Sequence, residues 1–271
     1  MKQSKLSSKR DAWSHDALLL AFNLYCKIPF SRTKSTNPAI IELARLIGRS
    51  ASAVAMKLGN FGSFDPSLRA RGVSGLTRAS KADRAIWNEF NGDWERLATE
   101  SELAMDRIGL PPDAVVNQQQ DNLKPILPYI AKQPSGPSET VRQAKARLHQ
   151  RFFRQTVLSA YGFKCCICDI SVPQFLIAGH IIPWATRSDL RANPHNGLCL
   201  CSLHHDAFDT GFLTVDPKYH VRISKRMDRF LPNTLLEAAF YRFTDQAMTL
   251  PEKFQPDPTF LLFHSKELFL D

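Results

Sequence analysis

One stretch of this chain, residues 165–209, gathers the residue types that hold metal ions and transfer protons. It contains five of the six cysteines and four of the eight histidines of the sequence. A hydrophobic core has no need of thiols and imidazoles at this density, because it is filled mainly by aliphatic side chains. We therefore expect the stretch to hold two metal sites, one structural and one catalytic.

The structural site is predicted from two short spacings. Cys165 and Cys168 form C-x-x-C, and Cys201 and His204 form C-x-x-H. Two such pairs brought together by a hairpin give the closed tetrahedral set that zinc prefers in structural sites. Three alternatives remain open: Cys166 as a ligand in place of Cys165, which gives the less usual C-x-C spacing; a group of buried free thiols; and a redox dithiol, although no thioredoxin-like βαβ pattern surrounds it.

The predicted catalytic site uses residues that the zinc site leaves over. His180 lies in the strand-like run LIAGHIIPW, Asn196 in the turn NPHNG, and His205 and Asp209 one helical turn apart in HHDAFD. Strand, turn and helix form a ββα unit suited to one-metal phosphodiester hydrolysis. We expect His205 and Asp209 to hold a divalent ion, Mg²⁺ or Mn²⁺, and His180 to take a proton from water. Asn196 would fix the loop through side-chain to backbone bonds.

Two adjacent histidines divide the two sites. Neighbours on a helix point about 100° apart, so His204 and His205 face different directions. We expect His204 to complete the zinc site while His205 faces the phosphate.

This stretch resembles the HNH nucleases of the ββα-metal superfamily, and among them the C-terminal HNH domains of bacterial restriction endonucleases. The resemblance covers about residues 138–215 and rests on C-x-x-C, H-I-x-P-W, N-G-L-x-L and H-x-x-F-D-x-G. It implies that His180 is the general base, Asn196 the middle asparagine and His205 a metal ligand. Asp209 falls where colicin-type members place a further ligand. Many members have Asp or His directly before the base histidine, where this chain has Gly179. Two alternatives follow: an ion held by His205 and Asp209 with water and phosphate, or an impaired site.

The overall composition agrees with a polyanionic partner. The net charge is +9 and the isoelectric point is about 9.4, although a basic surface without a special role would look the same. The basic N-terminus has no apolar segment of signal-peptide length, and no window reaches membrane-spanning length. We therefore expect a cytoplasmic protein with reduced cysteines, and we expect the isolated Cys26 to be a core residue.

The N-terminal part, residues 1–105, is predicted to be a helical DNA-recognition domain. Asn37 and Pro38 begin one short amphipathic helix, Gly48 ends it, and Ser50 begins a second. This is the pattern of a helix-turn-helix, and the glycine-rich stretch 63–80 could be its wing; a purely structural pair of helices is the alternative. The residues expected to contact DNA, in this part and on a basic helix starting near Ser138, are Arg49, Ser52, Lys57, Asn60, Arg69, Arg71, Arg151 and Arg154.

One long helix is expected from Lys81 to Glu102, because Trp87, Phe90, Trp94 and Leu97 recur at helical spacing. Residues 106–137 are rich in Pro, Gln and Asn and are predicted to be an interdomain linker. Beyond residue 211 we expect a hairpin turning at Asp216-Pro217 and a final helix starting at Asp257-Pro258, with His264 on its surface.

The predicted fold class is α+β, with a mostly helical, winged or helix-turn-helix-like N-terminal domain and a zinc-stapled ββα-metal domain over residues 138–271. The predicted function is metal-dependent cleavage of DNA, and the expected substrate is double-stranded DNA. Two protomers of a homodimer, or two visits, would then cut both strands. The resemblance points further to bacterial defence, including restriction of modified DNA. The alternatives are a non-catalytic zinc-stabilised DNA-binding regulator and an HNH nuclease acting on RNA.

Overall fold

The computed structural model describes residues 12–73, 79–108 and 137–271. Its fold is α+β, with helices dominating and two small antiparallel sheets. The helices of the first part are α1 (His15–Lys27), α2 (Pro38–Leu46), α3 (Ala51–Gly62), α4 (Pro66–Ala70), α5 (Lys81–Phe90) and α6 (Trp94–Arg107). Those of the second part are α7 (Pro137–Ala160), α8 (Ser202–Asp209), α9 (Thr234–Ala239) and α10 (Pro258–Glu267).

The strands form two separate hairpins. β1 (Leu176–His180) pairs with β2 (Gly197–Cys201), and β3 (Leu213–Val215) pairs with β4 (Val221–Ile223). Short 3-10 helices occupy several connections: Phe30–Arg32, Pro173–Phe175, Ser188–Leu190, Pro194–Asn196, Lys225–Phe230 and Tyr241–Phe243. The hairpin expected at Asp216-Pro217 is present, as is the final helix, whose N-cap is Asp257.

Helix α1 is the centre of the N-terminal part. All ten residues from Ala17 to Cys26 are buried, because α2, α3, α5, α6 and α7 all lie against this helix. Cys26 is fully buried, as expected of a core residue. A helix that is apolar on every side can exist in water only when other elements surround it.

The long helix expected from Lys81 to Glu102 is in fact two helices, so that prediction was wrong. α5 ends at Phe90 and α6 begins at Trp94. Gly92 between them has φ +110°, a conformation that side-chain-bearing residues rarely adopt. Asp93 then caps α6 by accepting a hydrogen bond from the backbone N–H of Arg96. The aromatic residues at this spacing are core residues, since Trp87, Phe90 and Trp94 are all buried.

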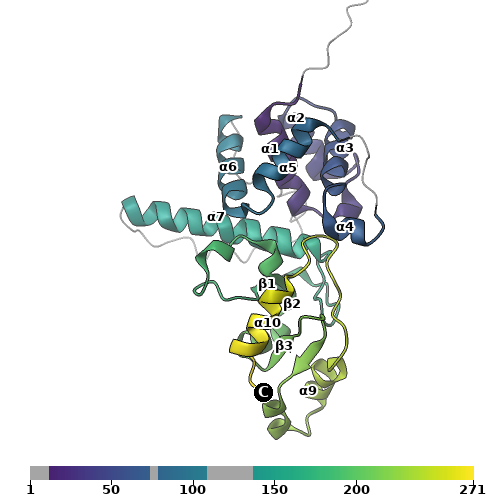
Figure 1. The fold of residues 1–271 in the computed structure, drawn as a ribbon, viewed down its shortest axis with the longest axis vertical. Coiled ribbons are helices and arrows are strands. Elements are labelled where there is room, and N and C mark those ends of the chain that lie inside the picture. Colours follow the sequence, from purple (N-terminus) through teal and green to yellow (C-terminus); the bar gives the residue numbers. More distant parts are fainter. Residues whose placement is uncertain (1–11, 74–78, 109–136) are drawn as a thin grey trace, which may run out of the picture.

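Helix α7 joins the two parts of the molecule, lying across it between the N-terminal helices and the C-terminal unit (Figure 1). It contacts α1 and α6 on one side and both strands of the β1–β2 hairpin on the other. The buried apolar residues of the two parts form one continuous cluster. The expected linker, residues 106–137, lies almost entirely outside the described residues, and α6 extends two residues past the expected boundary at 105.

A buried lysine ties the C-terminal part to the end of α1. Lys253 is fully buried, and its ammonium group donates to the backbone carbonyls of Tyr25 and Ile28, the latter over 2.9 Å. It also lies over the ring of Tyr25, 4.3 Å from the centroid. The last carbonyls of a helix have no hydrogen-bond donor within the helix. Lys253 supplies that donor from a segment more than two hundred residues away. Burial lowers the pKa of Lys253 to about 8.

The predicted recognition helix α3 exposes fewer of the residues expected to contact DNA than its sequence suggested. Asn60 was expected to point outward, but it is buried and donates to Asp83 over 2.7 Å. Lys57 is likewise bound to Asp83, at 2.7 Å. Asn60 therefore lies in the interior, because α5 covers this side of α3. Of the other residues expected to contact DNA, Ser52 is exposed, and Arg49 donates to the carbonyl of Ala12 and lies over the ring of Trp13.

Asp83 is the polar centre of this contact and is fully buried. It completes the capping box of α5 with Ser80 while accepting bonds from Lys57 and Asn60. Burial alone would raise the pKa of the Asp83 carboxyl, but the bonds from Lys57, Ser80 and Asn60 outweigh burial and lower the pKa. Its contribution to stability is therefore present above the unfolded-state pKa and is lost as the pH falls through the lower folded-state pKa.

We predict that Asp83→Ala lowers the free energy of unfolding by about 3–5 kcal/mol, because it leaves a half-buried ammonium group and a buried amide without their partner. The matched control is Asp93→Ala, which removes only the cap of α6 and should cost about 1 kcal/mol. Urea denaturation followed by circular dichroism measures both values. Equal losses of unfolding free energy in the two variants would show that the contact between Asp83 and Lys57 stabilises the fold no more than a helix cap does.

Candidate active site and metal centre

The predicted ββα unit is present in the structure. β1 and β2 pair antiparallel with His180 opposite Gly197 and Leu176 opposite Cys201. Helix α8 follows β2 without an intervening loop and lies against both strands. The unit therefore carries His180 at the end of one strand and two histidines on the helix that crosses it.

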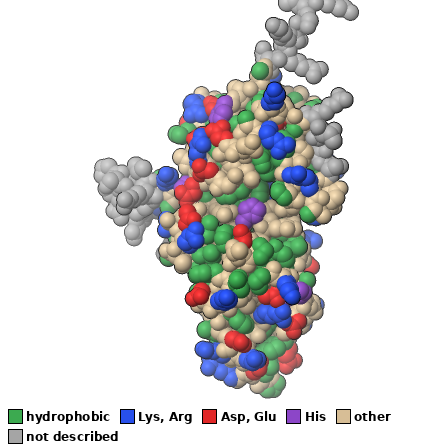
Figure 2. All heavy atoms as spheres, in the orientation of Figure 1, with side chains coloured by type: hydrophobic (Ala, Val, Ile, Leu, Met, Phe, Trp, Pro, Cys, Tyr) green, Lys and Arg blue, Asp and Glu red, His purple; other side chains and the backbone are tan. Residues whose placement is uncertain are grey.

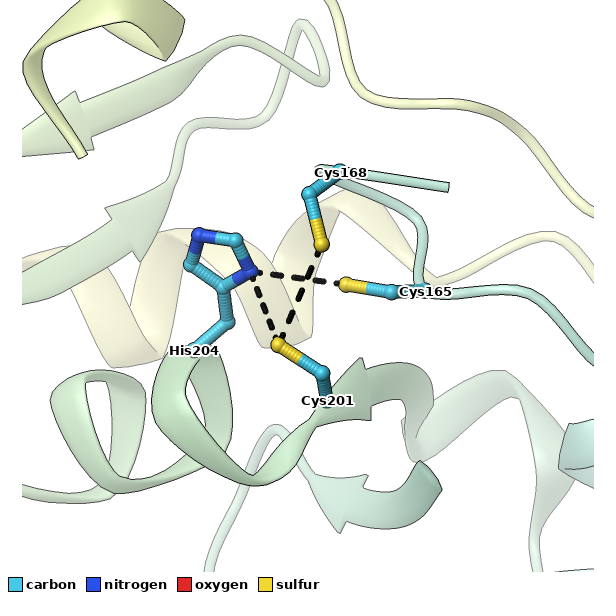
Figure 3. Close-up of side chains that lie close together, drawn as sticks. All are labelled: Cys165, Cys168, Cys201 and His204. Atoms are coloured by element: carbon cyan, nitrogen blue, oxygen red, sulfur yellow. Dashed lines mark hydrogen bonds between the residues drawn. The ribbon is translucent and has the colours of Figure 1, made fainter. Parts of the chain in front are cut away.

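Four side chains gather at one end of this unit. They point toward one another from the segment after α7, from the end of β2 and from the first turn of α8 (Figure 3). The four residues are Cys165, Cys168, Cys201 and His204. One ligand-type atom from each lies within 4.8 Å of every other. These are the four residues that the spacing assigned to zinc.

The distances in this cluster suit a tetrahedral metal. Sγ of Cys168 and Sγ of Cys201 are 3.9 Å apart, and Nδ1 of His204 lies 3.2 Å from Sγ of Cys201 and 3.5 Å from Sγ of Cys165. Zn–S bonds of about 2.3 Å at tetrahedral angles place two sulfurs roughly 3.8 Å apart. The Cys3His cluster therefore fits a bound metal such as zinc.

The surroundings of the cluster fix the orientation of His204. Its Nε2 lies 2.7 Å from the backbone carbonyl of Ala239, so this nitrogen donates and Nδ1 is left as the ligand atom. Phe240 and Phe243 meet the ring edge-on. The hydrogen bond between the two thiols lowers the pKa of Cys165 and raises the pKa of Cys201, so one thiol of the pair holds a proton that a bound metal would displace.

The two surplus cysteines are core residues. Cys199 is fully buried on β2. Cys166, the alternative ligand, is also buried, and its backbone N–H donates to the carbonyl of Cys199. Burial raises the pKa of both thiols. Cys166 thus ties the C-x-x-C segment to β2 through its backbone and lies outside the Cys3His cluster.

His180, the predicted general base, is held on three sides. Its Nε2 lies 3.1 Å from the backbone carbonyl of Arg191. Its ring stacks on Phe153, with centroids 3.8 Å apart and planes 10° from parallel, and meets Trp184 edge-on at 5.5 Å. A carbonyl can only accept, so Nε2 carries the proton of the neutral imidazole. Nδ1 is therefore the nitrogen with a free lone pair, the form that a general base needs.

Asn196 joins the two ends of the loop between β1 and β2. The side chain is buried, its Oδ1 accepts from the N–H of Ile182 at 2.8 Å, and its Nδ2 donates to the carbonyl of Ile182 at 3.0 Å. The backbone carbonyl of Asn196 also accepts from the N–H of Ile181. These are side-chain to backbone bonds of the kind expected, and they fix the chain directly after His180.

His205 and Asp209 lie together on α8, facing away from the Cys3His cluster. Nε2 of His205 is 3.4 Å from the Asp209 carboxylate. The His205 side chain is 19% exposed and that of Asp209 is 53% exposed. Partial burial raises the pKa of Asp209, and His205 opposes that rise. His204 and His205 thus face different surroundings, as their helical spacing requires.

Gly179 lies directly against His205. A Cβ built at Gly179 would be 3.0 Å from Cδ2 and 3.5 Å from Nε2 of that imidazole. A larger residue here would push the ring aside, so the glycine permits the close approach of α8 to β1. An imidazole and a carboxylate, partly open to solvent, are ligands that a divalent ion accepts in a catalytic site, so the residues present fit such an ion.

The basic residues expected to contact nucleic acid take different positions. Arg154 is exposed on α7 next to the β1–β2 unit, while Arg151 lies 3.7 Å from Glu102 of α6. Arg69 and Arg71 are exposed at the end of α4, and Arg69 donates to the carbonyl of Phe64. On the face drawn in Figure 2, basic and acidic side chains are interspersed and do not form a single basic stripe. Contact with DNA by these residues stays a prediction.

Sequence reasoning missed three residues that surround His180. They are Phe153, Trp184 and Arg191. Trp184 follows His180 by four residues in the motif H-I-x-P-W, which was the available signal. No spacing links Phe153 or Arg191 to His180, since they meet it only through the packing of α7 and the folding of the loop. His264, expected on the surface, is also buried, stacked on Phe208 with its Nδ1 2.8 Å from the Thr214 hydroxyl.

Residues 165–216 match a family model described as HNH endonuclease. The matched stretch begins at the first cysteine of the cluster and extends past α8, so it contains the whole ββα unit. No curated protein matches the chain. Among the described residues, no helix is both long and apolar enough to cross a membrane.

We predict that His204→Ala releases the metal and destabilises the C-terminal part, whereas His205→Ala on the next residue keeps it. His204 contributes its Nδ1 to the cluster of ligand atoms, and His205 is not one of the cluster's residues. A closed zinc site contributes folding energy. Elemental analysis after gel filtration measures bound zinc, and thermal unfolding measures stability. Cys168→Ser should behave as His204→Ala does. A folded, metal-free Cys168→Ser protein would contradict the structural assignment.

Proposed function

We propose that this protein cuts DNA with the HNH endonuclease domain at residues 165–216, and that its site uses a divalent ion. The observation that carries the proposal is the environment of His180. Its Nε2 is bound by the carbonyl of Arg191, which leaves Nδ1 as a proton acceptor. The preceding residue, Gly179, lies against His205, so the base and the helix of the proposed ion ligands are adjacent.

In the proposed reaction, Nδ1 of His180 takes a proton from the water that attacks phosphorus. The bond from phosphorus to the 3′-oxygen breaks and that oxygen takes a proton from solvent water, giving 5′-phosphate and 3′-hydroxyl ends. Asn196 keeps His180 in place by holding the chain that follows it. His205 and Asp209 would hold Mg²⁺ or Mn²⁺, which supplies positive charge to the phosphate and to the leaving oxygen. In the same proposal zinc occupies the Cys3His cluster and stabilises the fold.

The net charge and the family resemblance support the choice of DNA as substrate and the role in bacterial defence. The charge of +9 favours a polyanion, and duplex cleavage by a domain with one site requires two protomers or two successive cuts. A role in bacterial defence, including restriction of modified DNA, follows from the resemblance to restriction-type HNH domains alone. A non-catalytic regulator would share the Cys3His cluster, but it would have no use for a base histidine beside a second ligand pair.

We expect the purified protein to nick supercoiled plasmid DNA when Mg²⁺ or Mn²⁺ is added. His180→Ala should reduce the rate by about 10²–10⁴-fold, the usual contribution of a general base. His220→Ala is the control, because His220 lies on the β3–β4 hairpin, away from this unit. Gel electrophoresis and end mapping on unmodified DNA, modified DNA and RNA identify the substrate. Zinc-loaded protein that cuts none of these with either ion would rule the proposal out, and cutting of RNA alone would favour the RNA-directed alternative.

The rate should fall only at acidic pH. Burial lowers the pKa of His180, the Arg191 carbonyl partly opposes this, and His205 adds to the lowering. A base must be neutral to accept a proton, so activity is present above the pKa of His180 and lost below it. We therefore expect the acid limb of kcat/KM to have its midpoint below about 6.5, the ordinary value for histidine. Single-turnover rates from about pH 5 to 8 at saturating ion measure it, and a midpoint above 7 would contradict the assignment of the base.

A further inference from the structure

The ring of His180 is enclosed by groups from two parts of the chain that the sequence does not connect. One side is Phe153 of α7, stacked face to face at 3.8 Å. The other is the loop between β1 and β2, from which Trp184 makes a T-shaped contact with the imidazole and the carbonyl of Arg191 binds it. These contacts hold both the plane of the imidazole and its rotation within that plane.

The loop side is itself a closed set of contacts. The Arg191 guanidinium lies over the Trp184 ring, 4.8 Å from the centroid, and its Nε donates to the carbonyl of Trp184 at 3.2 Å. Trp184 in turn meets His180, and the backbone of Arg191 binds Nε2 of His180. The side chain of Arg191 therefore fixes the position of its own carbonyl, which sets the tautomer of His180.

Phe153, which covers His180 from the side of α7, is itself packed against the paired strand β2. Phe153 is 2% exposed, and its ring also lies against Gly197, opposite His180 on the paired strand. A Cβ built at Gly197 would be 3.0 Å from the Phe153 ring and would collide with Val157. The neighbouring Phe152, equally buried, lies on the α1 side of the helix, where Lys27 approaches its ring. α7 thus carries two adjacent phenylalanines with similar burial and different partners.

We propose that Phe153 and the Trp184–Arg191 pair are positioning residues that hold His180 in the orientation in which Nδ1 receives the proton. The inference rests on the proposed function of His180. None of the three need touch the reacting phosphate, because they act through the imidazole. Misplacement of a reacting group by about 1 Å can cost about 10²-fold in rate, so an off-plane His180 ring should lower turnover strongly.

The test compares two neighbouring substitutions, Phe153→Leu and Phe152→Leu, in the full chain. Both remove one buried aromatic ring from α7, so both should lower the unfolding midpoint to a similar extent. Only Phe153→Leu should lower kcat for plasmid nicking, by about 10²-fold, with KM for DNA unchanged. Arg191→Met should also lower kcat without raising KM. A raised KM in Arg191→Met would instead indicate direct contact with the substrate and would remove Arg191 from the proposal.

A second measurement needs no substrate and separates this proposal from the nuclease assignment. Ring protons stacked over a phenylalanine face are shielded, so the His180 signals in a histidine-labelled NMR spectrum should lie upfield of ordinary values. His180→Gln identifies them by their loss. Phe153→Leu should return them to ordinary values, while Phe152→Leu should not. Unshielded signals in the wild type, or equal kcat in the two leucine variants, would overturn the proposal; shielded signals in a protein that cuts nothing would leave the stacking correct and the nuclease function wrong.

Discussion

The geometry of the site depends on the close packing of α7 on the β1–β2 hairpin at Gly197. Phe153 and Val157 lie where a side chain at Gly197 would stand, and Gly197 is paired with His180. Any larger residue would lift the helix from the hairpin and withdraw the Phe153 ring from the imidazole. Because α7 also packs on α1 and α6, the position of His180 is linked through one helix to the N-terminal part.

The Cys3His cluster fixes the other end of the same unit. Cys201 ends β2 and His204 lies in the first turn of α8, so a metal held there would set the angle at which the helix leaves the strand. That angle brings His205 against Gly179. The glycine found in place of an acidic or histidine neighbour to the base therefore has a steric consequence, since it gives the His205 ring the space next to β1.

Much of this could be predicted because the signals are local. Helix starts at Asn37, Ser50 and Asp257 follow from caps that bond within three residues, and all three are present. The four cluster residues were identified by two-residue spacings on adjacent elements. The break between α5 and α6 was missed because one glycine with positive φ, Gly92, outweighed a continuous aromatic pattern. Asn60 was misplaced because helical spacing alone does not reveal that α5 would cover that face.

The sequence by itself determined the family of the domain, the Cys3His set, and the strand, turn and helix that carry His180, Asn196 and His205. These depend on residue types and short spacings, which the backbone geometry of hairpins and helices converts directly into position. Only the tertiary structure decided that the helical part and the nuclease unit share one core. It also decided that Lys253 binds the carbonyls at the end of α1, and that Phe153, Trp184 and Arg191 surround the imidazole of His180. Most of those contacts join residues distant in sequence, and long-range packing leaves no periodic mark in the chain. Trp184 is only four residues from His180, but its contact depends on how the loop folds.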